Sequence, residues 1–177
     1  IWRELLKDYK LIHTHPTLDP TTNRRSGGTI LAARRDTYKD VTAIPTPPHI
    51  GDYVSAATLT PHDGSPIIAI SAYMPQLHTK ARDTIYTDIL TWIHTEIIIK
   101  YPTITTLMGG DLQATPSKED ERSYHPPLHD FCTATGLHHI TPINLHIYIP
   151  ARTSLDHWLL RQTNTIIHYT NTNTKIT

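Results

Sequence analysis

The stretch Leu107–Ala114, LMGGDLQA, ends the apolar run ITTLM with two glycines and then a carboxylate, Asp111. A glycine pair before an acidic residue is typical of a turn. The same pattern is expected where a buried strand delivers a catalytic side chain to the edge of a sheet. Both interpretations fit the stretch alone, so the rest of the chain has to separate them.

The composition bounds the class of protein. The 177 residues suffice for one domain with a core, since 38% of them are hydrophobic. Sixteen basic and sixteen acidic residues give a formal net charge of zero, so the total charge indicates no long-range attraction to nucleic acid. No apolar run approaches the roughly 20 residues of a membrane-spanning helix, which predicts no membrane partner.

The cysteine and histidine content also limits which class of protein this can be. The single cysteine, Cys132, excludes an internal disulfide, which fits a reducing compartment, and we interpret it as a small buried hydrophobic residue. No basic and then apolar signal segment opens the chain at Ile1. We therefore expect an intracellular protein, nuclear or cytoplasmic. The adjacent His138 and His139 have no Cys or carboxylate at ligand spacing, which disfavours a zinc site there.

Hydrophobic periodicity predicts both strands and helices. Asp63-Gly64 indicates a hairpin, and isoleucines at four-residue steps predict a helix over 81–101 that Pro102 ends. A second helix is expected over 126–137. The first twelve residues should hold the end of a short helix and then a strand, and residues 13–28 should form a loop. Further strands are expected at 28–35, 52–60, 67–74, 103–111, 144–149 and 154–160. This order predicts an α/β fold with a mixed sheet and helices outside it.

Four short motifs carry the chemistry. They are RRSGGT at 24–29, SAYMP at 71–75, GGDLQAT at 109–115 and SLDHWLL at 154–160. In this order they resemble the endonuclease/exonuclease/phosphatase superfamily, the deoxyribonuclease I-like fold. They are closer to the apurinic-type endonuclease domain of non-LTR retrotransposons than to the phosphatases. The resemblance covers the chain from about Tyr9 onward and implies a four-layer α/β sandwich of mixed sheets flanked by helices.

The resemblance also implies roles for the residues that match. Asp111 corresponds to the aspartate that activates or orients the attacking water and contacts the metal. Gln113 stands where the family has an asparagine that holds the phosphate, so its amide lies one methylene further out. Tyr73 corresponds to a tyrosine that contacts the phosphate or the leaving group. Asp156 corresponds to an aspartate that orients a catalytic histidine.

Other residues take lesser roles by the same resemblance. Ser154 is expected to support the substrate-binding loop, and His157 occupies the position of a family aromatic residue. The pair Arg24-Arg25 is expected to contact the phosphate backbone of the substrate. Solvated surface charges explain this basic pair about as well.

The resemblance predicts that residues 1–177 are a single, incomplete domain. The family's first strand carries an asparagine and the next a metal-binding glutamate, and both are expected before Ile1. A terminal motif, SDH, is expected after Thr177.

Three functions follow from these motifs. The first is a fragment of a retroelement endonuclease whose parent cuts DNA with Mg²⁺ or Mn²⁺, within a larger polyprotein that includes a reverse transcriptase. The second is a catalytically dead remnant that at most binds nucleic acid, which the glutamine at 113 favours. The third is a metal-dependent phosphatase of the same fold.

Overall fold

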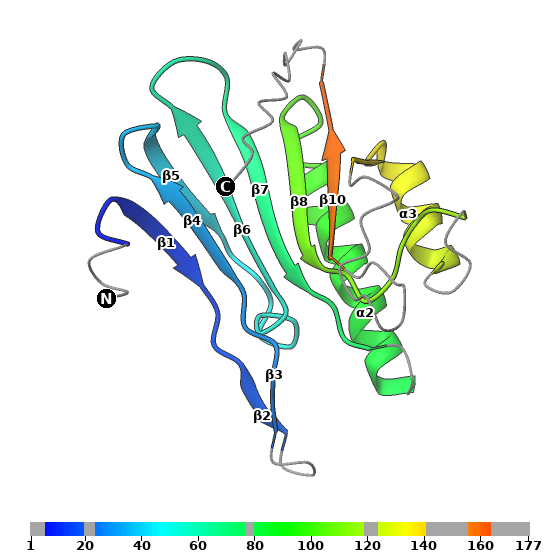
Figure 1. Cartoon of the computed structure of the whole chain (residues 1–177). Helices are drawn as coiled ribbons and strands as arrows, with labels where there is room; N and C mark the ends of the chain where they lie inside the picture. The colour runs from blue at the N-terminus through cyan, green and yellow to red at the C-terminus, as the bar shows by residue number, and fades with distance from the viewer. Residues whose placement is uncertain (1–5, 20–23, 77–79, 119–123, 141–155, 164–177) are drawn as a thin grey trace, which may run out of the picture.

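The computed structural model describes residues 6–19, 24–76, 80–118, 124–140 and 156–163 (Figure 1). These residues form ten strands, two α-helices and one π-helical turn. The strands are β1 (Tyr9–His13), β2 (Thr17–Asp19), β3 (Arg24–Ser26), β4 (Ile30–Arg34), β5 (Tyr38–Ile44), β6 (Val54–Pro61), β7 (Ile67–Tyr73), β8 (Thr105–Asp111), β9 (His138–His139) and β10 (Asp156–Arg161). The helical elements are α2 (Lys80–Trp92), the π-helical turn η1 (Ile93–Ile98) and α3 (Pro126–Thr135).

A six-stranded mixed sheet forms the centre, in the order β5-β6-β7-β8-β10-β9. Its named strand pairs are antiparallel except β7 and β8, which run parallel. A parallel pair needs a long crossover connection, and α2 with η1 provides it. This crossover brings the ends of β7 and β8 to the same edge of the sheet.

The β6–β7 hairpin confirms the turn that was predicted at Asp63-Gly64. Gly64 has a φ of +104°, which glycine adopts without steric cost. Ile68 and Ile70 of β7 are buried on one face and Ala69 on the other, so this strand is covered on both sides as its apolar sequence indicated.

The predicted helices are also confirmed. Ile89, Ile93 and Ile97 are fully buried against the sheet. At the β-branched isoleucines 97–99 the α-helix changes to the π-helical turn η1. There the Ile99 N–H donates to the His94 carbonyl, five residues earlier, at 2.9 Å. The second helix, α3, ends at Gly136, whose φ of +69° is typical of a left-handed cap.

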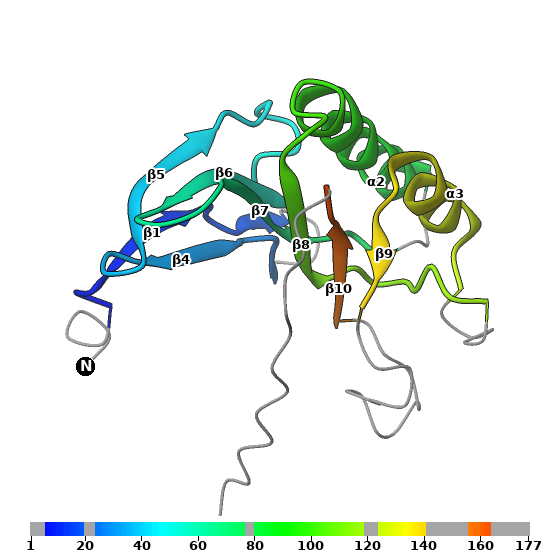
Figure 2. The same cartoon turned by 90° about the horizontal axis from the view of Figure 1, so that it is seen from above.

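Three layers are visible among the described residues. Figure 2 shows α2 and α3 on one face of the six-stranded sheet and the antiparallel pair β1–β4 on the other. The main core lies under the helices. A smaller core lies between the sheets, formed by Ala33, Val41, Ala57, Leu59 and Ala69. The mixed α/β architecture that the motifs predicted is confirmed, while the described residues show three of the four expected layers, with no helix over β1 and β4.

Some predictions need correction or lie outside the described residues. The segment 13–28 was expected to be a loop, but it contains the antiparallel hairpin β2–β3. The strand β5 was not predicted. The expected strand at 144–149 lies outside the described residues. No helix in the described part of the chain is long and apolar enough to span a membrane.

Candidate active site

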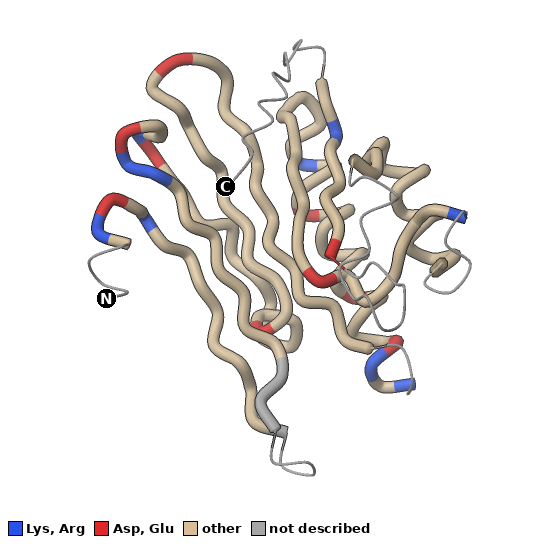
Figure 3. The backbone as a smooth tube through the Cα atoms, in the orientation of Figure 1, with Lys and Arg blue, Asp and Glu red and all other residues tan. Residues whose placement is uncertain are grey.

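Three sequence-predicted side chains come from neighbouring strands of the central sheet. Tyr73 ends β7 and is the parallel partner of Asp111, which ends β8. Asp156 begins β10 and is the antiparallel partner of Asp111. Figure 3 shows two acidic positions side by side at the lower ends of β8 and β10. Residues that are far apart in sequence therefore meet at one rim, as expected for a site at a strand end.

The glycine pair of the GGD motif lies inside β8 and does not form a turn. Gly110 has a φ of +138°, and a Cβ there would lie 1.9 Å from the carbonyl oxygen of Ala72. A Cβ on Gly109 would lie 2.5 Å from the ring of Trp158, its partner on β10. Both positions therefore need glycine, because β8 is approached closely from both neighbouring strands.

The Asp111 carboxylate accepts two hydrogen bonds from Gln113. Its Oδ1 accepts the Gln113 backbone N–H at 3.1 Å, and its Oδ2 accepts the side-chain Nε2 at 2.5 Å. Gln113 adopts a φ of +53°, which is uncommon for a residue other than glycine. This backbone conformation turns the chain back toward Asp111, so the glutamine amide contacts the carboxylate itself.

The surroundings of Asp111 disfavour its charged form. Asp111 is half-buried, and this burial is the largest cause that raises its pKa above the ordinary value. The negative charge of Asp156 raises the pKa further, while the two hydrogen bonds from Gln113 lower it. The result is a carboxyl group that holds its proton to a higher pH than a free aspartate.

The Asp111–Asp156 pair fits a divalent cation in its donor chemistry. Mg²⁺ takes oxygen ligands, with one or two carboxylates completed by waters and substrate phosphates. A cation beside Asp111 would also offset the repulsion that Asp156 exerts. Among the described residues no group of three or more His, Cys, Asp or Glu side chains is placed to hold a metal. Among the described residues, the support for a metal ion at this rim is therefore limited to the carboxylates of Asp111 and Asp156.

Backbone hydrogen bonds join this rim to the loop before β6. The Tyr73 N–H donates to the Tyr53 carbonyl at 2.8 Å, and the Met74 N–H donates to the Asp111 carbonyl at 2.8 Å. The position of Tyr73 is thus fixed from both sides.

The other residues that the sequence singled out lie on β3, on β10 or outside the described residues. Arg24 and Arg25 lie on β3 in the hairpin β2–β3. Ser154 lies outside the described residues. His157 follows Asp156 on β10 and is 2% exposed.

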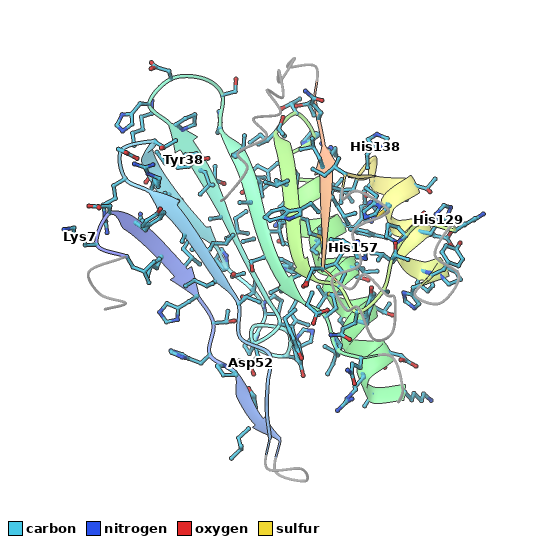
Figure 4. The ribbon with its side chains drawn as sticks, in the orientation of Figure 1. Lys7, Tyr38, Asp52, His129, His138 and His157 are labelled. Atoms are coloured by element: carbon cyan, nitrogen blue, oxygen red, sulfur yellow. The ribbon has the colours of Figure 1, made fainter. Side chains whose placement is uncertain are left out.

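A partly buried histidine pair was not predicted from the sequence. His139 Nε2 lies 2.9 Å from the Nδ1 atom of His157, at hydrogen-bonding distance. Figure 4 labels His157 on β10. Burial, and then the neighbouring His157, lower the pKa of His139 to about 4. The two residues meet because β9 pairs with β10, and no local sequence signal indicates that pairing.

At the level of sequence, no protein-family model and no curated protein matches the chain. Solved structures with the same fold do match. The human Nocturnin catalytic domain with bound sulfate is 16% identical, with a TM-score of 0.59, over 91% of this chain and 64% of that one. An endonuclease/exonuclease/phosphatase family protein from Bacteroides thetaiotaomicron is 11% identical, with a TM-score of 0.55, over 90% and 63%.

An AP endonuclease from Archaeoglobus fulgidus is 12% identical, with a TM-score of 0.55, over 88% of this chain and 67% of that one. The chain thus spans a little under two thirds of the first two structures that it matches. At these identities the likeness concerns the fold. The order of the strands, the helix-covered face and these matches together show that the chain has the deoxyribonuclease I-like fold of the endonuclease/exonuclease/phosphatase superfamily.

Proposed function

We propose that the chain belongs to an endonuclease that hydrolyses DNA phosphodiester bonds at the rim formed by Tyr73, Asp111 and Asp156. The observation that carries this proposal is the pairing of the three residues on adjacent strands. An attacking water must lose a proton, and the phosphate gains charge in the transition state. In this proposal the rim supplies a proton acceptor and a phenol donor.

Each residue has a chemical role in this proposal. Asp111 accepts the proton of the attacking water as a general base. The Tyr73 phenol donates a hydrogen bond to the phosphate or to the leaving oxygen. Mg²⁺ or Mn²⁺, held by Asp111 with Asp156 beside it, would neutralise charge on the phosphate.

The retroelement origin is part of the proposal and rests on the motifs. The order of RRSGGT, SAYMP, GGDLQAT and SLDHWLL supports the non-LTR retrotransposon branch of the superfamily. In that setting the partners are DNA and a reverse transcriptase in the same polyprotein, and the protein acts inside the cell.

One observation favours a second function, which is nucleic-acid binding without cutting. The Gln113 amide donates to Asp111 at 2.5 Å and so contacts the carboxylate that should activate water. An asparagine, one methylene shorter, would not reach back in the same way. In a binding remnant this hydrogen bond would hold Asp111 in an inactive arrangement.

The experiment measures cutting and binding separately. Conversion of supercoiled plasmid to open circles is followed with Mg²⁺, Mn²⁺ or a chelator, and duplex binding is followed by fluorescence anisotropy. Both the 177-residue chain and a version extended at each end by the motifs that the resemblance predicts are assayed. Asp111→Asn and Tyr73→Phe are compared with a control, Asp36→Asn. Asp36 lies in the turn between β4 and β5, at the opposite end of these strands from the rim.

The endonuclease proposal expects no useful nicking by the 177-residue chain alone. It expects metal-dependent nicking by the extended version, which Asp111→Asn abolishes, Tyr73→Phe reduces at least tenfold and Asp36→Asn leaves unchanged. Gln113→Asn should raise the rate if the longer amide restrains Asp111. Tight binding without nicking in every variant supports the binding remnant. Phosphate release from a phosphomonoester, with intact plasmid, would replace both with a phosphatase.

A further inference from the structure

The short loop after β8 is held on the helix-covered side of the sheet. Leu112, Ala114 and Thr115 are at most 1% exposed, whereas Gln113 turns back toward Asp111. The backbone of Gln113 has a φ of +53°, an uncommon value that persists only where the surroundings maintain it. The contacts of this loop therefore decide how the Asp111 carboxylate is held.

One of these contacts comes from Tyr86 on α2. Its phenol hydroxyl donates a hydrogen bond to the Leu112 carbonyl oxygen at 3.2 Å, and this contact is buried. That carbonyl belongs to the same peptide unit as the Gln113 N–H, which donates to Asp111 Oδ1 at 3.1 Å. A trans peptide unit is planar, and its C=O and N–H point in opposite directions. Holding the carbonyl toward α2 therefore directs the N–H toward the Asp111 carboxylate.

Tyr86 is itself fixed in place. Its side chain is 1% exposed, and its ring meets the ring of His125 edge to face, with the centroids 4.8 Å apart. Burial raises the pKa of Tyr86 above its ordinary value, so the phenol keeps the proton that it donates. The Leu112 carbonyl therefore faces a rigid donor that stays protonated.

The next part of the loop is held by α3. The His125 N–H donates to the Thr115 carbonyl at 3.1 Å, and His129 Nδ1 lies 2.9 Å from the Pro116 carbonyl oxygen. Figure 4 labels His129 on this helix. These two contacts fix the loop beyond Gln113, so the peptide unit before Gln113 is the one that Tyr86 holds.

We propose that Tyr86 is a positioning residue of the candidate active site, because its hydroxyl orients the peptide unit whose N–H fixes the Asp111 carboxylate. This role rests on the proposed function, since it assumes that the carboxylate activates the attacking water. A reacting group that is misplaced by about 1 Å can lose roughly a hundredfold in rate. A buried tyrosine on α2 thereby controls the rate of cutting without contacting the substrate.

The hydroxyl alone separates this role from ordinary core packing. Tyr86→Phe keeps the ring and its contact with His125, but it removes the donor to the Leu112 carbonyl. Packing predicts a change in the stability of the whole domain, whereas positioning predicts local release of the Gln113 N–H. Thr135→Val is a matched control. Thr135 is also buried, and its hydroxyl donates to the Phe131 carbonyl at 2.7 Å, near the end of α3 that is remote from the loop.

The first experiment measures amide hydrogen exchange by NMR in the 177-residue chain, so it does not depend on activity. We expect Tyr86→Phe to speed exchange of the Gln113 N–H about tenfold or more, because its peptide unit can rotate away from Asp111. The Ile70 N–H, at the centre of β7, reports unfolding of the whole sheet and shows how far each variant is destabilised. Thr135→Val should leave exchange at Gln113 unchanged.

Two unnatural side chains at position 86 isolate the donor from the space that it fills. 4-Aminophenylalanine restores an N–H donor in place of the hydroxyl and should restore slow exchange at Gln113. 4-Methylphenylalanine fills the same space without a donor and should behave as Tyr86→Phe does. This pair also keeps the test decisive if the smaller phenylalanine does not fold. Far-ultraviolet circular dichroism confirms that each variant is folded.

The second experiment measures nicking of supercoiled plasmid by the extended version in Mg²⁺, with rates divided by the concentration of folded protein. We expect Tyr86→Phe to lower kcat about tenfold and to leave KM for DNA unchanged, because Tyr86 contacts no substrate. 4-Aminophenylalanine should recover most of the rate. Thr135→Val should change neither kcat nor KM.

The outcomes separate a failure of the positioning role from a failure of the proposed function. Equal exchange at Gln113 in the wild type and Tyr86→Phe would reject the positioning role, and so would an unchanged kcat in Tyr86→Phe. The same result for the amino and methyl side chains would reject it as well. An extended wild-type protein that never nicks DNA would remove the proposed function, whereas faster exchange in Tyr86→Phe would still support the contact through which Tyr86 orients the loop.

Discussion

The two faces of the six-stranded sheet are packed differently. Under α2, η1 and α3 the face is filled by large side chains with no exposed surface, such as Ile68, Met108 and Leu159. Under β1 and β4 it is filled mostly by small ones, and a cavity of about 370 Å³ remains there. Trp158 borders this cavity and is 52% exposed.

The two faces of the sheet therefore contribute differently. The helix-covered face stabilises the fold, and the strand-covered face leaves space and exposed surface. Buried apolar area contributes roughly 25 cal/mol per Å², so the helix-covered face should supply most of the stability. The strand-covered face has small residues that allow two sheets to lie close together, but it leaves space and exposed aromatic surface. The rim formed by Tyr73, Asp111 and Asp156 lies at the ends of strands that pack against the helices. We therefore expect its geometry to depend mainly on the helix-covered core.

The largest effect is expected where β8 touches β7. Gly110→Ala would place a Cβ against the immovable carbonyl of Ala72, in a backbone conformation that alanine avoids. We expect a loss of about 4 kcal/mol or more, or no folded protein. Gly109→Ala would meet the ring of Trp158, which is half-exposed and able to shift. Its cost should be about 1–3 kcal/mol, measured by urea denaturation. Equal costs would contradict this account.

Core truncations compare the two faces directly. Ile93 is fully buried under the helices, so Ile93→Ala should lower the free energy of unfolding by about 2–5 kcal/mol. Val41, at 4% exposure on the strand-covered face, loses two methyl groups in Val41→Ala, which should cost about 1–2 kcal/mol. The check is chemical denaturation of both variants under one condition. A larger loss at Val41 would reverse the ranking of the faces.

Added volume should have opposite effects on the two faces. Ala69 borders the cavity, so Ala69→Val has room and should stabilise by about 0.5 kcal/mol. Ala56 is 1% exposed in the helix-side core, so Ala56→Val should cost about 1–3 kcal/mol through overpacking. Thermal denaturation of the pair gives the sign of each change. A destabilised Ala69→Val variant would show that the cavity does not accept side chains.

The last effect concerns pH. His139 has a pKa of about 4 in the folded protein, below the ordinary 6.5, so the unfolded chain binds more protons between these values. Stability should therefore be lost as the pH falls from 6.5 toward 4. Because His139 is only half-buried, we expect about 1 kcal/mol.

His139→Gln keeps a polar partner for His157 but does not titrate, so its unfolding free energy should depend less on pH. His138→Gln changes the exposed neighbour and should keep the wild-type slope. Denaturation at several pH values measures both slopes, and the same slope in all three proteins would contradict the assignment to His139.

Local signals predicted much of the central sheet. The Asp63-Gly64 turn, the isoleucine steps of α2 and the carboxylate at the end of β8 each need only a few neighbouring residues, and all three are confirmed. The meeting of Tyr73, Asp111 and Asp156 needed the family resemblance, since no local pattern pairs strands so far apart. The roles of these residues in catalysis stay predictions.

Other features depend on contacts that the sequence does not display. The three-residue strands β2 and β3 lie among Pro, Thr and Asn, a composition that indicates a loop. The edge strand β5 buries only Val41, so it shows no clear alternation. The bond between Gln113 and Asp111 follows from a left-handed backbone at Gln113, and the hydrogen bond from Tyr86 to Leu112 was missed because the two residues lie 26 positions apart.

The parallel pairing of β7 with β8 also has a consequence for the order of folding. β5, β6 and β7 join through adjacent hairpins, whose contacts are local and form early. The contacts of β8 with β7 require closure of the long loop that contains α2 and η1, so we expect β8 to dock later. Tyr73 and Asp111 become neighbours in that late step. A probe at this rim would therefore report the slow phase of refolding, while a probe in the β6–β7 hairpin would report the fast one.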